Sequence, residues 1–114
     1  MNTVNEFNDY RSRMNERLLG TGDKVIKRMY NLDTNAFQDG HLKTTTKELI
    51  GLTCSLVLRC DDCVKYHLGK CHELQFSTEE VTEAMSLATL IGGTIVIPHL
   101  RRAVEYWDAL NEHV

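Results

Sequence analysis

A cysteine pair followed by a histidine is the pattern in this chain that is best suited to chemistry. Cys60, Cys63 and His67 lie at positions i, i+3 and i+7. On a helix, these spacings place both sulfurs and the imidazole along one face. Three residues of helix separate the two cysteine Cα atoms by about 5 to 6 Å, which is within the range that a disulfide needs. The spacing therefore predicts a dithiol that can close and open reversibly.

The neighbouring residues offer ways to activate this dithiol. A thiol attacks a peroxide or a disulfide as its thiolate, which is favoured at a helix N-terminus or beside a base. We expect Asp61 to be the N-cap of the helix, which would put Cys63 in its first turn. His67 follows Cys63 by four residues, within reach as a proton acceptor. A nucleophile and a base are thus both present.

The elements that must position this site are predicted to be helices. Apolar residues recur at spacings of three and four, no useful strand-like alternation is present, and glycines separate the periodic segments. We therefore predict an all-α fold of about six helices. The expected helices are 4–18; one beginning after Thr21 or Asp23, with a short continuation through Phe37 capped by Asp33 or Thr34; 44–57; about 61–73; one beginning at a capping box from Ser77 to Glu80; and 99–110 behind Pro98, after a break at Gly92 and Gly93.

Periodicity also predicts the buried faces. Segment 44–57 is apolar around most of its circumference and should be central. Cys54 within it is expected to be a small core residue. The run from Leu87 to Ile97 is expected to be core or subunit interface. The other apolar positions assigned to helices are Val4, Phe7, Tyr10, Met14 and Leu18; Val25, Ile26, Met29 and Tyr30; Val81, Ala84, Met85, Ala88 and Ile91; and Leu100, Ala103, Val104, Trp107 and Leu110.

Length, charge and cysteine content limit the function classes. A chain of 114 residues is expected to be one domain, residues 1–114, that buries about 65% of its unfolded surface. A net charge of −3 without a basic cluster argues against nucleic acid binding. The charged N-terminus does not resemble a signal peptide, and no apolar run approaches the roughly 20 residues of a membrane helix, so we expect a cytoplasmic protein. Cysteines in that compartment favour redox or metal chemistry.

Three stretches together resemble the carboxymuconolactone decarboxylase and AhpD-like alkylhydroperoxidase family over roughly residues 35 to 110. They are Lys47–Leu52, the Cys-x-x-Cys-x-x-x-His motif, and the helix start at Ser77–Val81 that precedes the glycine pair. In the AhpD-like branch, a glutamate twelve residues before the first cysteine joins the site, and Glu48 matches it here. The resemblance implies that Cys63 attacks, Cys60 resolves, His67 is the base and Glu48 orients it.

The resemblance also implies a helical fold that assembles as a homo-oligomer, commonly a trimer or hexamer, without metal or flavin. Its substrates would be peroxides or small disulfides, and its reductant a lipoyl or thioredoxin-like dithiol. The function we predict is therefore a peroxidase-like thiol-disulfide redox enzyme. Alternatives within the family are a disulfide reductase and a decarboxylase, although the decarboxylase branch typically lacks the cysteine pair.

Simpler interpretations compete for individual residues. Glu48 could complete a capping box begun by Thr45. His99 could line the site, but a partly buried, hydrogen-bonded histidine is favoured. Residues taken as surface or helix-end positions are Cys71, His72 and His41.

Two further function classes stay open. Cys60, Cys63, His67 and Cys71 have the composition of a zinc site, but a straight helix separates the Cys60 and Cys71 Cα atoms by roughly 16 Å. A helical interaction module with regulatory cysteines is the other rival.

Overall fold

Helices build the fold between residues 3 and 112, which are the residues that the computed structural model describes. This part of the chain contains no strand, and the predicted all-α class is confirmed. None of its helices is both long and apolar enough to cross a membrane. The helices are α1 (Thr3–Leu19), α2 (Lys24–Ala36), α3 (Thr44–Val57), α4 (Asp61–Glu73), α5 (Thr78–Gly92) and α6 (Ile97–Glu112), with a short 3-10 helix η1 (Thr94–Val96) before α6.

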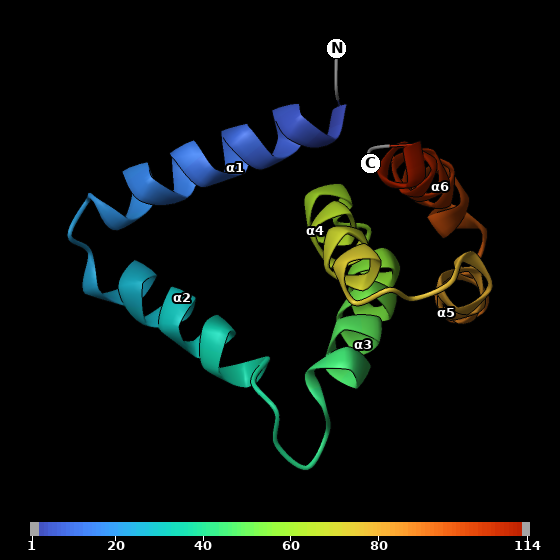
Figure 1. Ribbon diagram of the computed structural model, residues 1–114, viewed down its shortest axis with the longest axis horizontal. Helices are drawn as coiled ribbons and strands as arrows, with labels where there is room; N and C mark the ends of the chain where they lie inside the picture. Colours follow the sequence, from blue (N-terminus) through green and yellow to red (C-terminus); the bar gives the residue numbers. More distant parts are fainter. Residues whose placement is uncertain (1–2, 113–114) are drawn as a thin grey trace.

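The α3 and α4 helices lie side by side at the centre, with α5 packed against α3 and α6 packed against α4 (Figure 1). α1 and α2 form an arm that leaves the four central helices near α6 and returns to them at the start of α3 (Figure 1). The cysteine pair at the start of α4 therefore belongs to the central helices.

The hydrophobic core lies between α3, α4, α5 and α6. Leu52 and Leu56 of α3 and Leu68 of α4 are completely buried. Each such leucine contributes roughly 1.5 to 3 kcal/mol through burial. The inner face of α3 is thus central, as its composition predicts. The other buried apolar side chains are Val4, Val64, Cys71, Val81, Met85, Ala88, Val96, Ala103, Tyr106, Trp107 and Leu110.

Most helix ends follow the local signals in the sequence. Ser77 and Glu80 form the predicted capping box at the start of α5. Gly93, at φ 84°, ends α5, so the glycine pair is a helix break as predicted. The expected cap at Asp33 or Thr34 is wrong, because α2 continues unbroken to Ala36.

Several apolar residues assigned to buried faces are exposed. In α2, the exposed fractions of Val25 and Met29 are 68% and 62%, because this helix lies in the arm and not against the core. The prediction that these two side chains face inward is wrong for the single chain. Other exposed apolar side chains are Tyr10, Leu18, Leu19, Leu32, Leu42, Ile50, Leu58, Leu74, Leu87, Leu90, Ile91, Ile95 and Val104.

Two cysteines exchange their predicted environments. Cys54, expected in the core, is exposed, and Cys71, expected at the surface or a helix end, lies in the last turn of α4 and is completely buried. Cys54 lies two residues from both Leu52 and Leu56, which puts it on the opposite side of α3. Cys71 follows Val64 and Leu68 by seven and three residues, which puts it on the buried side of α4. A core position for Cys54 and a surface position for Cys71 are therefore both wrong.

Candidate active site

Cys60 occupies a junction that ends one central helix and begins the next. Arg59 is left-handed, with φ 61°, and the Cys60 N–H donates to the Ser55 carbonyl at 3.1 Å, which closes a Schellman-type end for α3. Cys60 is also the N-cap of α4, because its Sγ accepts from the Cys63 N–H at 3.3 Å. The expected N-cap, Asp61, is instead the first helical residue. The Asp61 carboxylate contacts His99 and Arg102 of α6, and Cys60 Sγ is the atom that caps α4.

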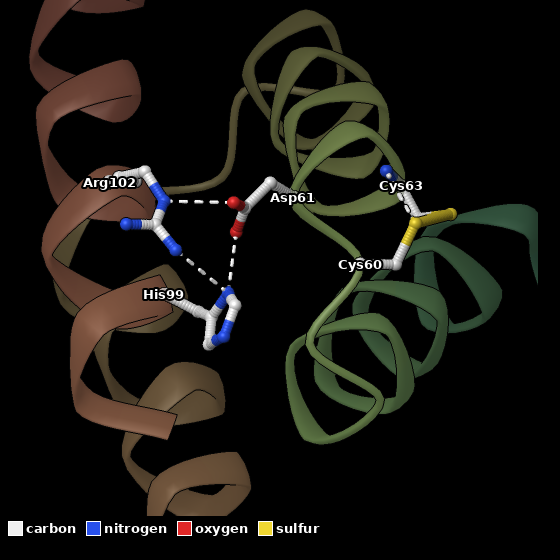
Figure 2. A network of polar contacts seen from close by, with 5 residues as sticks. All are labelled: Cys60, Asp61, Cys63, His99 and Arg102. Carbon is white, nitrogen blue, oxygen red and sulfur yellow. Dashed lines mark hydrogen bonds and ion pairs between the residues drawn. A yellow bond between two sulfur atoms is a disulfide. The ribbon is translucent and has the colours of Figure 1, made fainter. Parts of the chain in front are cut away.

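Cys60 and Cys63 form a disulfide across the first turn of α4 (Figure 2). Their Cα atoms are 5.3 Å apart, in agreement with the separation expected from helical spacing. Cys63 is exposed, whereas Cys60 is half-buried. The more exposed cysteine is thus the one that the family resemblance assigns to attack.

Glu48 and His67 form a buried pair that connects α3 to α4. His67 Nδ1 lies 2.7 Å from Glu48 Oε1, and the side chains are 11% and 5% exposed. Because a carboxylate only accepts, this contact requires a proton on Nδ1 and leaves Nε2 as the acceptor. α3 begins at Thr44 behind Lys43, which provides no side-chain cap, so the alternative in which Glu48 completes a capping box is wrong.

Gly51 makes room for the His67 ring, a role that was not predicted from the sequence. A Cβ at position 51 would lie 2.6 Å from His67 Cε1 and 2.8 Å from Nε2, both shorter than real carbon contacts. The Phe37 ring, 5.4 Å away between centroids, also packs against the imidazole. A glycine inside a helix costs about 1 kcal/mol relative to alanine, and that local cost was the available signal.

Cys63 and His67 line the same cavity of about 500 Å³. The arm supplies much of the remaining wall, through Arg11 and Asn15 of α1 and Met29, Tyr30, Asp33 and Thr34 of α2, with Asp62 and Tyr66 from α4. A hydrogen bond of 2.7 Å from the Tyr30 hydroxyl to Asn15 joins the two arm helices. Amphipathic periodicity could not assign these residues to a site, because it does not say what a helix covers.

The cavity wall does not include Cys54, Cys71, His41 or His72. Burial, followed by the charge of Glu48, raises the pKa of Cys71 to about 12, so its thiol stays protonated. Cys54 is exposed on α3. His72 is half-buried with its ring edge-on to Trp107, and His41 is exposed. Within residues 3–112, no group of His, Cys, Asp and Glu side chains is arranged to hold a metal ion.

His99 contacts the first turn of α4 from α6. Its Nδ1 lies 2.8 Å from Asp61 Oδ1, and Arg102 Nε donates to Asp61 Oδ2 at 2.8 Å. His99 is therefore the hydrogen-bonded, partly buried histidine favoured from the sequence. Burial alone would raise the pKa of Asp61, but the hydrogen bonds from His99 and Arg102 outweigh it and lower that pKa.

Comparison with known proteins shows which family the sequence matches. A family model for the carboxymuconolactone decarboxylase family matches residues 23–106, a range that contains Glu48, Cys60, Cys63 and His67. An uncharacterised protein of Cupriavidus necator is 33% identical over 76 residues, which are 67% of this chain and 67% of that protein.

Solved structures of that family share the fold. The crystal structure of a Thermotoga maritima family protein, for which involvement in an antioxidative response has been suggested, matches with a TM-score of 0.90 and 47% identity over 94% of this chain and 91% of that one. A second crystal structure from Thermotoga maritima gives a TM-score of 0.92 and 47% identity, over 95% of each chain. A family protein from Legionella pneumophila matches with a TM-score of 0.81 at 24% identity, over 98% and 97% of the two chains, a likeness of fold.

Proposed function

The chain belongs to the carboxymuconolactone decarboxylase family, and from this premise we propose that it is a peroxidase-like thiol-disulfide redox enzyme of the AhpD-like kind. One observation carries the proposal. The exposed Cys63 of the disulfide lines the same cavity as the His67 imidazole, and the buried Glu48 carboxylate contacts Nδ1 of that imidazole. This is the arrangement of a nucleophile, a base and a group that orients the base.

The oxidative step begins with the reduced dithiol. His67 Nε2 accepts the Cys63 proton, and Glu48 stabilises the imidazolium that forms. The Cys63 thiolate attacks the terminal oxygen of a peroxide, so that an S–O bond forms and the O–O bond breaks. The leaving alkoxide takes the proton from His67 and departs as an alcohol, leaving Cys63 as a sulfenic acid.

The second step closes the disulfide. The Cys60 sulfur attacks the Cys63 sulfur, the S–S bond forms, and the sulfenic oxygen leaves as water with the Cys60 proton. The dithiol has then lost two electrons and the peroxide has gained them. We propose that a lipoyl or thioredoxin-like dithiol returns these electrons by thiol-disulfide exchange. Such a cycle needs a reducing compartment, and we assign the protein to the cytoplasm on that ground.

We also propose that the protein acts as a homo-oligomer, a trimer or hexamer, in which a second copy covers α2. Val25, Met29 and Leu32 are exposed at positions i, i+4 and i+7, which form one stripe on this helix. Met29 also lines the Cys63 cavity. Light scattering coupled to size-exclusion chromatography should give a multiple of 13.1 kDa, and a Met29→Glu variant should shift toward the monomer.

Thiol chemistry tests the proposed function directly. Reduced protein is mixed in turn with hydrogen peroxide, an organic peroxide and oxidised lipoamide, while free thiols are counted and disulfides are mapped by mass spectrometry. Loss of two thiols with a Cys60–Cys63 product supports the proposal, and the reagent that reacts fastest separates a peroxidase from a disulfide reductase. If no reagent oxidises the pair, the proposal fails.

A further inference from the structure

A charged network lies directly behind the cysteine pair. Figure 2 shows the Asp61 side chain pointing to α6, while Cys60 and Cys63 lie on the other side of the α4 N-terminus. Asp61 accepts one hydrogen bond at 2.8 Å from Arg102 Nε and has a second contact of 2.8 Å with His99 Nδ1. Since the carboxylate cannot donate, His99 Nδ1 must carry the proton in this contact, and its 3.1 Å approach to Arg102 is not a second hydrogen bond.

The position of Asp61 creates an electrostatic conflict. An anionic side chain in the first turn stabilises the helix through its dipole. The same charge disfavours a thiolate formed nearby, and Asp61 is adjacent to Cys60 and two residues before Cys63. Unlike Asp62, which is exposed, Asp61 has a side chain that is only 34% exposed, so solvent screens it less. Arg102 supplies an opposite charge to this carboxylate from within the protein.

We propose that Arg102 and His99 are positioning residues of the dithiol site, which hold the Asp61 carboxylate on the α6 side of α4 and neutralise its charge so that the cysteine pair forms a thiolate more readily. This inference rests on the proposed function and assigns to α6 a part in that site. Arg102 supplies the balancing charge, and His99 supplies a second fixed donor. The two residues lie 41 and 38 positions from Asp61 in the sequence.

Other ionisable groups around the dithiol stay constant in a test of this network. Those that line the cavity with Cys63 are Arg11 of α1, Tyr30 and Asp33 of α2, and Asp62, Tyr66 and His67 of α4, and Glu48 of α3 contacts His67. Across a helix, a unit charge roughly 10 Å away in a medium of effective dielectric constant about 40 changes the ionisation of a thiol roughly fourfold. This sets the size of effect to expect.

The test compares iodoacetamide alkylation of reduced variants across pH, with each cysteine followed separately by mass spectrometry. Arg102→Leu removes the balancing charge but leaves His99 to hold Asp61, and Asp61→Asn removes the carboxylate charge. The double variant Asp61→Asn with Arg102→Leu completes the cycle. Arg101→Leu is the matched control on the preceding residue of α6, and exposed Cys54 is the internal reference for each sample.

We expect Arg102→Leu to slow Cys63 alkylation roughly fourfold at neutral pH, relative to Cys54. Arg102→Lys and the double variant should return to within a factor of about two of wild type, as should Arg101→Leu. If Arg102→Leu matches wild type, or if Asp61→Asn slows alkylation as much as Arg102→Leu does, charge balance is refuted. Because no peroxide is used, this result is independent of whether the protein turns over peroxides.

Discussion

A methyl group at position 51 should displace the histidine of the candidate site. In Gly51→Ala, the new Cβ would lie 2.6 Å from His67 Cε1, and the α3 backbone that carries it is fixed by the buried Leu52. The ring must therefore move and lose its 2.7 Å hydrogen bond to Glu48, which is buried and would be left without that partner. A hydrogen bond to a charged group contributes roughly 1.5 to 3 kcal/mol.

A second glycine, Gly69, allows the cost of the lost hydrogen bond to be separated from the helix propensity of alanine. Alanine is favoured over glycine in a helix by about 1 kcal/mol, which opposes the loss in Gly51→Ala. Gly69 lies inside α4, and a Cβ added there would have no neighbouring atom within 4 Å, so Gly69→Ala should gain that propensity without a clash. Because both variants gain this propensity, their free energies of unfolding should differ by the lost hydrogen bond alone, about 1.5 to 3 kcal/mol, with Gly51→Ala the less stable.

The assay has two readouts, urea unfolding for stability and iodoacetamide alkylation for the Cys63 thiolate. Gly51→Ala should lower stability and slow alkylation of Cys63, whereas Gly69→Ala should leave alkylation unchanged. The reasoning is refuted if Gly51→Ala is as stable as Gly69→Ala and reacts like wild type, because the imidazole would then tolerate the added carbon.

Further predictions concern single side chains. Glu48→Gln keeps an acceptor for His67 but removes the charge that stabilises imidazolium, so Cys63 alkylation at neutral pH should fall while the protein stays folded; an unchanged pH profile would exclude the relay. Cys63→Ser should abolish peroxide turnover, whereas Cys60→Ser should stop at a sulfenic acid detectable by mass spectrometry; equal behaviour of the two would reverse or remove the assigned roles. The pKa of Asp61 is lowered from 3.8, so its contacts stabilise the fold fully above that value, and this stability is lost as pH falls through the lowered pKa. The free energy of unfolding, measured against pH, should therefore fall less in acid for Asp61→Asn than for wild type, and an identical fall would contradict the ion pair.

The helices could be predicted from the sequence because they depend on local signals, whereas the contact between Glu48 and His67 was implied by the family resemblance. Spacing of apolar residues fixed α3, and the capping box fixed the start of α5. The distance between the Cα atoms of Cys60 and Cys63 follows from their separation by three residues of helix, which does not depend on what surrounds the helix.

The misassigned residues depend on what a helix packs against. Val25 and Met29 form an apolar stripe, but the stripe does not say whether this chain or another covers it. Cys54 was placed inside because α3 is apolar on most sides, although its exposed side also carries Ile50. The contacts of Asp61 with α6 could not be predicted from local sequence patterns, because they join residues about 40 positions apart.

The sulfur at the N-cap of α4 has a spectroscopic consequence. The Cys63 amide donates to Cys60 Sγ, and this atom is a disulfide sulfur in the oxidised protein and a thiol or thiolate sulfur in the reduced one. A thiolate attracts an amide proton more strongly than a neutral sulfur does. The chemical shift of the Cys63 amide in a nitrogen-15 spectrum should therefore change with the redox state, while that of the buried Leu52 amide in α3 stays unchanged. One backbone proton thus provides a probe of the dithiol that needs no added label on sulfur.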